Sequence, residues 1–207
     1  MRYSTLAPAL AATFLAGAAG AGAAPAAAPA AAAVPAAADH RYTLDAAKSS
    51  LQFTFLQAGA PNTGRFPRFA VALDFPGADP AGGRLEVTVE VAALDTGDKD
   101  RDDTLKSDDL FAVKKFPQAH FSATQIVKTS AGYQAAGQLT IRGVTRAASV
   151  PFTFREVTEG GAAAAYMAGK TVVRRLDYGV GQGDWKATDQ AGNEVTVSFN
   201  LRLTAAH

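Results

Sequence analysis

The sequence has 207 residues and contains no cysteine. Disulfide bonds, thiol redox chemistry and cysteine-ligated metal sites are therefore excluded, as is lipid attachment to an N-terminal cysteine. A chain without disulfides depends on packing for its stability, so we expect one domain with a substantial hydrophobic core.

Histidine is also scarce, and the sequence contains only His40, His120 and His207. Many hydrolases combine a histidine with a nucleophile or a metal, but neither the G-x-S-x-G nor the H-E-x-x-H motif occurs. We therefore expect no catalytic residues, no metal site and no cofactor. These absences argue against a catalytic centre.

No charge of one sign dominates, because 20 lysine and arginine residues are balanced by 19 aspartate and glutamate residues. Proteins that bind nucleic acids usually carry a basic patch or stripe that supplies much of their affinity. We therefore expect no nucleic-acid partner.

The first 38 residues contain no acidic residue, and 20 of them are alanine. Arg2, followed by an apolar run and small residues, is typical of a secretory signal peptide, which we place at residues 1–23. The run is too short for a permanent membrane anchor, which takes ~20 residues, so we expect no membrane-spanning segment. Residues 24–38 form an Ala/Pro-rich linker, and residues 39–207 form the folded domain.

Apolar and polar residues alternate with a period of two in several stretches, which predicts half-buried β-strands. The clearest case is residues 84–91, where every second residue is leucine or valine. Turn residues separate the stretches, and we interpret residues 59–64 as a loop because they contain glycine, proline and asparagine. The predicted strands are residues 51–57, 66–75, 84–94, 120–127, 133–142, 147–157, 163–175 and 193–203.

Regularly spaced strands with almost no helical periodicity predict an antiparallel sandwich or a closed barrel. The last strand is long and apolar on one face, and pairing it with the first strand would remove an exposed edge. The interior of an eight-stranded barrel is either filled by side chains or holds one small apolar ligand.

A polar segment, residues 94–121, interrupts the strand pattern and carries seven aspartates. Four of these match positions 1, 3, 5 and 12 of a calcium-binding loop: Asp98, Asp100, Asp102 and Asp109. That loop also needs a glycine at its turn and a glutamate at position 12, and the segment has neither. Catalysis by the aspartates together with His120 is a further alternative.

We interpret this segment as a short helix that covers one mouth of the barrel. Asp98 can cap its N-terminus, and further aspartates in its first turn favour the helix dipole. Asp102 and Lys106 stand four residues apart and can form an ion pair. Four apolar side chains would dock the helix onto the barrel: Leu105, Leu110, Phe111 and Phe116.

Four segments resemble signatures of the YceI-like family: residues 42–55, 94–121, 139–145 (LTIRGVT) and 174–185. The resemblance implies an all-β, extended lipocalin-like, eight-stranded antiparallel barrel with a short helix at one mouth, located in the periplasm. It also implies binding or carriage of a long apolar lipid, such as a polyprenyl chain or an isoprenoid quinone, rather than catalysis. One residue departs from the pattern, because Gln57 stands where many members have a histidine.

Phenylalanine is the commonest aromatic residue, with twelve copies, and several lie on one face of the predicted strands. We expect these faces to line a cavity that holds the lipid by burial of apolar surface. The predicted lining residues are Phe53, Phe55, Phe69, Val71, Val89, Phe121, Leu139, Phe152, Phe154 and Phe199. The alternative is a stress-protective or partner-binding barrel with a filled interior, and either form can be a homodimer.

Overall fold

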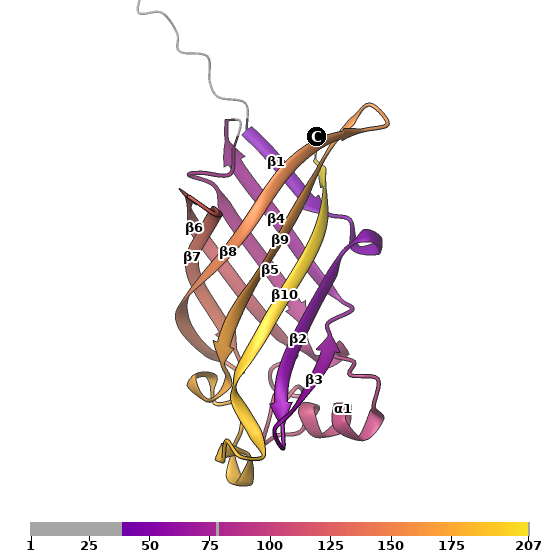
Figure 1. Cartoon of the computed structure of the whole chain (residues 1–207), viewed down its shortest axis with the longest axis vertical. Coiled ribbons are helices and arrows are strands. Elements are labelled where there is room, and N and C mark those ends of the chain that lie inside the picture. Colours follow the sequence, from indigo (N-terminus) through magenta and orange to yellow (C-terminus); the bar gives the residue numbers. More distant parts are fainter. Residues whose placement is uncertain (1–38, 78, 207) are drawn as a thin grey trace, which may run out of the picture. The chain divides into compact units, whose positions relative to one another are not determined.

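The computed structural model describes residues 39–77 and 79–206, so the predicted signal peptide and linker lie outside the described residues. Ten antiparallel strands and one α-helix make up this part of the chain (Figure 1). The strands are β1 (Asp39–Leu44), β2 (Ser50–Gln57), β3 (Ala60–Arg65), β4 (Phe69–Pro76), β5 (Arg84–Glu90), β6 (Gln118–Thr129), β7 (Gly132–Ile141), β8 (Val144–Glu159), β9 (Ala162–Arg174) and β10 (Ala191–Ala205). The helix is α1 (Lys99–Lys106), and the 3-10 helices are η1 (Ala46–Lys48), η2 (Val91–Ala93), η3 (Arg175–Tyr178) and η4 (Gly183–Lys186).

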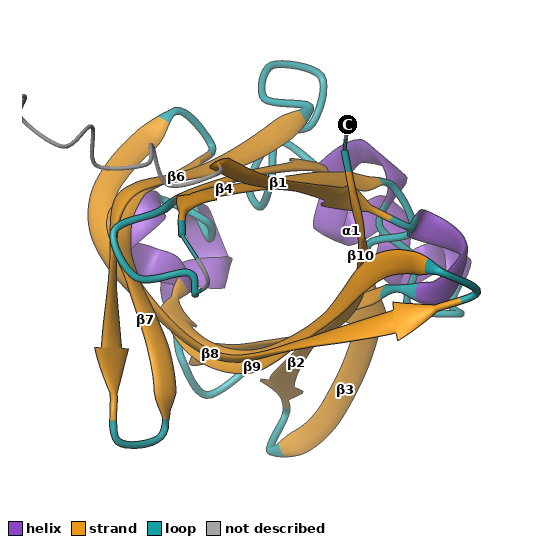
Figure 2. Ribbon diagram, turned by 90° about the horizontal axis from the view of Figure 1, so that it is seen from above, coloured by secondary structure: helices purple, strands orange, loops and turns teal. Residues whose placement is uncertain are grey.

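Strand β10 closes the barrel by pairing along both of its edges. One edge pairs with β9, and the other pairs with β1 near one end and with β2 along most of its length. Eight strands thereby form a ring in the order β1-β4-β5-β6-β7-β8-β9-β10 (Figure 2). The predicted eight-stranded antiparallel barrel is confirmed, and β2 and β3 extend its wall beyond the ring.

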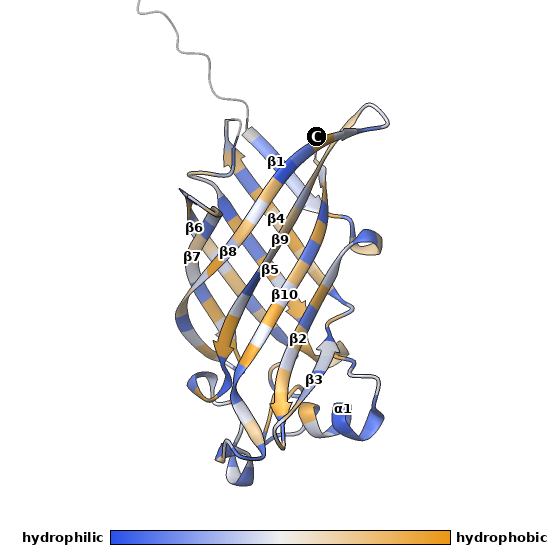
Figure 3. Ribbon diagram, viewed as in Figure 1, coloured by the Kyte–Doolittle hydropathy of each residue, from blue (hydrophilic) through white to orange (hydrophobic). Residues whose placement is uncertain are grey.

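Apolar and polar residues alternate along the strands, as Figure 3 shows. In β5, for example, Leu85 is 1% exposed, whereas its neighbours Arg84 and Glu86 are exposed. Successive side chains of a strand point to opposite faces, so one face of each ring strand turns inward. These inward faces meet in one continuous hydrophobic core. Among the described residues, no helix has the length and apolar character needed to cross a membrane.

Of residues 59–64, for which the composition predicted a loop, only Gly59 lies in a turn. Ala60–Arg65 form β3, which is the second strand of a hairpin with β2. Gly64 serves close packing rather than a turn, because a Cβ atom at this position would lie 2.3 Å from the Phe53 ring. The third predicted strand also ends earlier than expected, at Glu90, where η2 follows.

Helix α1 begins as predicted. The Asp98 carboxylate accepts a hydrogen bond of 3.0 Å from the backbone N–H of Arg101, which makes Asp98 the N-cap. Asp100 and Asp102 follow in the first turn, where their negative charge stabilises the helix dipole. The helix lies at the lower end of the barrel in Figure 1, beside the ends of β2 and β3.

The predicted ion pair between Asp102 and Lys106 is wrong. The Asp102 carboxylate instead accepts hydrogen bonds from the backbone N–H and the hydroxyl of Thr96, at 2.9 and 2.7 Å. An i,i+4 pair does form on this helix, but between Lys99 and Asp103. Asp102 thus ties the helix to the segment that precedes it.

The predicted docking residues of the helical segment pack against the barrel. Leu105 and Phe111 contact the main core, and Leu110 is buried in a smaller cluster with Tyr178. The Phe116 ring covers the turn between β7 and β8, where Gly143 leaves room for it.

Arg202 on β10 joins the two sides of the closing seam. Its guanidinium donates hydrogen bonds of 2.6 Å to Asp45, between β1 and β2, and of 2.7 Å to Glu159, at the end of β8. The Arg202 side chain is only 12% exposed. Hydrogen bonds from Arg202, and then from Tyr166, hold the pKa of Glu159 below its ordinary value.

We predict that this seam weakens in acid. Because folding lowers the pKa of Glu159, its contribution to stability is present above the unfolded-state pKa and is lost as the pH falls through the folded-state pKa. Glu159→Gln should therefore reduce the loss of stability below pH 4.5. Denaturant unfolding as a function of pH measures this. Glu194→Gln, which changes an exposed carboxylate on β10, should leave the profile unchanged, and an equal effect of both variants would contradict the prediction.

Candidate ligand-binding cavity

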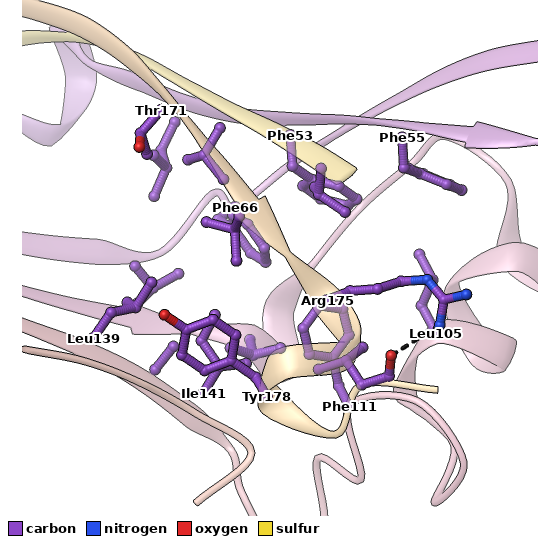
Figure 4. Close-up of a pocket in the computed structure, with 18 of the residues that line it drawn as sticks. Phe53, Phe55, Phe66, Leu105, Phe111, Leu139, Ile141, Thr171, Arg175 and Tyr178 are labelled. Atoms are coloured by element: carbon purple, nitrogen blue, oxygen red, sulfur yellow. Dashed lines mark hydrogen bonds between the residues drawn. The ribbon is translucent and has the colours of Figure 1, made fainter. Parts of the chain in front are cut away.

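The barrel encloses a cavity of about 500 Å³ at the end that carries α1. Pockets that hold small ligands usually have volumes of ~300–1,000 Å³. Its wall is almost entirely apolar and comes from strands β2, β4 to β10, the α1 segment and the loop between β9 and β10 (Figure 4). Such a wall can bind an apolar molecule but offers little to a polar one.

Eight of the ten predicted lining residues border this cavity: Phe53, Phe55, Phe69, Val71, Val89, Phe121, Leu139 and Phe199. Phe152 and Phe154 do not border it, although both belong to the core inside the barrel. The period of two identified their inward direction correctly, but both lie further along the barrel than the cavity extends. Whether the other eight contact a ligand stays a prediction.

Phe152 and Phe154 belong to an aromatic floor, which we define as Tyr42, Phe75, Phe152 and Phe154. The Phe154 ring packs edge-on against Tyr42 and Phe75, with ring centroids 5.8 and 5.6 Å apart. Tyr42 stacks on Phe75 at 5.8 Å. Phe152 is 3% exposed and stacks on Tyr133 of β7.

Several lining residues were missed because they lie at strand ends, outside regular strands or among polar neighbours. Phe66 precedes β4, and Leu105 and Phe111 belong to the helical segment, which was assigned only a docking role. Val173 followed the period-two pattern of its strand and could have been identified. The remaining members drawn in Figure 4 include Ile141, Thr171, Arg175 and Tyr178.

Polar groups gather where the cavity meets α1 and the end of β2. Asp98, Asp100 and Arg101 of the α1 segment border it there, and the two aspartates are exposed, so this end forms the mouth. Gln57 also borders it and is half-buried, and its side-chain amide has no hydrogen-bond partner in the described part of the chain. The residue that departs from the YceI-like pattern therefore lies at the mouth of the cavity.

Arg175 is a buried cation in the cavity wall and is 7% exposed. Its guanidinium donates to four backbone carbonyls, those of Val180, Ala187, Ala191 and Gly192, at 2.7–3.3 Å. Burial lowers its pKa. These hydrogen bonds tie the loop between β9 and β10 into the wall, so the main role of Arg175 is structural.

The residues considered for catalysis or metal binding do not converge. His120 borders the cavity, but its side chain is exposed and its Nδ1 lies 3.1 Å from the Thr88 hydroxyl. Asp98 and Asp102 are engaged in capping and in binding Thr96. Within residues 39–77 and 79–206, no group of three acidic or histidine side chains is arranged to hold a metal ion.

A family model described as a YceI-like domain matches residues 42–203. The chain belongs to the YceI-like family. Among curated relatives, a UPF0312 protein of Photorhabdus laumondii is 37% identical over 83 residues, which is 40% of this chain and 43% of the relative. The chain thus aligns with less than half the length of that relative.

Two solved structures have a fold similar to that of this chain. Burkholderia cenocepacia BcnA has 33% sequence identity and a TM-score of 0.70, and the match covers 77% of this chain and 98% of that one. A polyisoprenoid binding domain from Saccharophagus degradans, implicated in plant cell wall breakdown, has 18% identity and a TM-score of 0.59, with 80% and 98% covered. At that identity the second match supports the fold alone.

The adjacent residues Arg174 and Arg175 provide a test of the buried cation. Arg175→Met leaves four carbonyls without their donor, and we expect a loss of ~3 kcal/mol or more in the free energy of unfolding. Arg174→Met removes a side chain that is 63% exposed, and should change the free energy of unfolding by less than ~0.5 kcal/mol. Urea denaturation measures both values, and similar losses would contradict the structural role of Arg175.

Proposed function

We propose that this protein binds and carries a long apolar lipid with a polyisoprenoid chain in the barrel cavity. The observation that carries the proposal is the apolar cavity of about 500 Å³ inside a closed barrel. Each methylene group transferred from water into such a cavity contributes ~0.8 kcal/mol, so a chain of several isoprene units can bind through apolar contacts alone.

A domain of the same fold from Saccharophagus degradans is described as polyisoprenoid binding, which makes this class of ligand the first candidate for the cavity. An interior filled by side chains, the alternative from the sequence, would leave no cavity of this size, so the cavity favours the lipid. We propose carriage or sequestration rather than chemical conversion, and a wall made mostly of phenylalanine and aliphatic side chains supports this role.

The proposed location is the periplasm, on the strength of the signal-peptide pattern in residues 1–23. A carrier there would shield an apolar chain from water between two membranes. The candidate ligands are a polyprenyl lipid and an isoprenoid quinone.

Native mass spectrometry of the protein purified from its own periplasm tests the ligand class. We expect one bound molecule per chain, and organic extraction should release an isoprenoid whose mass accounts for the difference. A protein that carries no ligand and also fails to take up an added isoprenoid quinone would refute the proposal.

Two adjacent valines on β9 allow a matched test of the site. Val173 lines the cavity, whereas Val172 is 55% exposed on the outer surface. Val173→Asp places a charge in the apolar wall and should weaken binding of an isoprenoid quinone at least ~10-fold, while Val172→Asp should leave it unchanged. Trp185, the only tryptophan, borders the cavity, so quenching of its fluorescence measures binding. Equal affinities of the two variants would place the ligand elsewhere.

A further inference from the structure

The cavity ends part-way along several strands of the barrel. On β8, Val150 lines it, whereas Phe152 and Phe154 do not. On β4, Val71 lines it and Phe75 does not. The lining also stops between Leu201 and Leu203 on β10 and between Phe121 and Ala123 on β6.

The residues past this boundary are closely packed. Tyr42 is 1% exposed, Phe75 2%, Ile126 2% and Leu203 0%. All belong to the same buried core as the cavity wall, so this end is closed by side chains rather than by a mobile loop. The cavity is therefore blind, with its mouth at α1 and the aromatic floor opposite.

A hydrogen bond holds the floor in place. The Tyr42 hydroxyl donates to Glu156 on β8, the same strand that carries Phe152 and Phe154. Burial and this bond raise the pKa of Tyr42, so the hydroxyl remains a donor at physiological pH. Beyond the floor lies a second hollow of about 460 Å³, bordered by His40, Tyr42 and Glu156. Space thus exists past the floor, and the rings of the floor separate it from the cavity.

We propose that the aromatic floor, through Phe152 and Phe154, sets the longest apolar chain that the cavity accepts. The inference rests on the proposed function and adds a selection by chain length. An apolar chain enters tail first, because the free polar groups, including the Gln57 amide, lie at the mouth. Its polar end stays at α1 while its tail advances toward the floor.

This arrangement predicts that affinity rises with chain length up to a limit and then stops rising. We call the chain length at this limit the break. Every methylene that still finds apolar wall raises the association constant ~4-fold. Once the tail reaches the floor, further units remain outside in water and contribute nothing more. Side chains that fill a packed core resist displacement, so the break should be abrupt.

The experiment measures the affinity of isoprenoid alcohols of increasing length by Trp185 fluorescence. For the unaltered protein we expect the affinity to rise with length and then to level off. Phe152→Leu and Phe154→Leu each replace a ring of the floor with a smaller side chain and so lengthen the cavity. Each should shift the break to longer chains, and the affinity for the next longer alcohol should rise at least ~4-fold. Val150→Phe places a larger side chain in the cavity next to Phe152 on β8 and should shift the break to shorter chains.

Phe66→Leu is the matched control, because Phe66 borders the cavity away from the floor. This variant should change the affinity for all chain lengths by a similar factor and leave the break in place. Circular dichroism and the melting temperature verify the fold of each variant. Val150 is half-buried and faces the cavity, so Val150→Phe tests the inference even if the two floor variants do not fold.

The outcomes separate this inference from the proposed function. If the unaltered protein binds no isoprenoid alcohol of any length, the proposed function fails. If it binds them, but the break is absent or stays in place in the floor variants and in Val150→Phe, the proposed function stands and selection by the floor is refuted.

Discussion

A strand that pairs on both edges exposes no unpaired backbone groups, and β10 reaches this state with three partners, β9, β1 and β2. The backbone N–H of Asp45 donates to the carbonyl of Arg202 where β1 gives way to β2, so the seam is continuous. Closure turns one face of every ring strand inward. The continuous core, the cavity and the position of α1 all depend on it.

The interior that results differs between its two ends. Tyr42, Phe75 and Phe154 converge near β1 and fill the barrel there with aromatic rings. At the opposite end β2 and β3 extend the wall beyond the ring, and β2 and the α1 segment border the cavity there. One continuous sheet thus provides a packed half that supports the fold and an open half that can hold a ligand.

Local sequence patterns predicted those elements whose structure depends on residues that are neighbours in the sequence. Alternation identified β2, β5 and β10, and the position of Asp98 identified the start of α1. Alternation gives the face of a residue but not its depth in the barrel, which depends on the pairing of distant strands, so the sequence could not show that Phe152 lies outside the cavity lining. The same limit applies to Gly64, whose role is set by the ring of Phe53, and to Arg175, which no local rule distinguishes from Arg174.

A wall with few polar groups has little means of recognising a ligand other than by shape. An apolar pocket distinguishes ligands that differ by one methylene only ~4-fold, because each methylene contributes ~0.8 kcal/mol of burial energy. Steric exclusion is steeper, since a chain that meets a packed floor would have to displace the buried ring of Phe152 and the half-buried ring of Phe154. Polar interactions in the wall serve the fold, as in Arg175 with its four carbonyls. Selectivity in this barrel is therefore expected to follow the length and width of the apolar chain more than its head group.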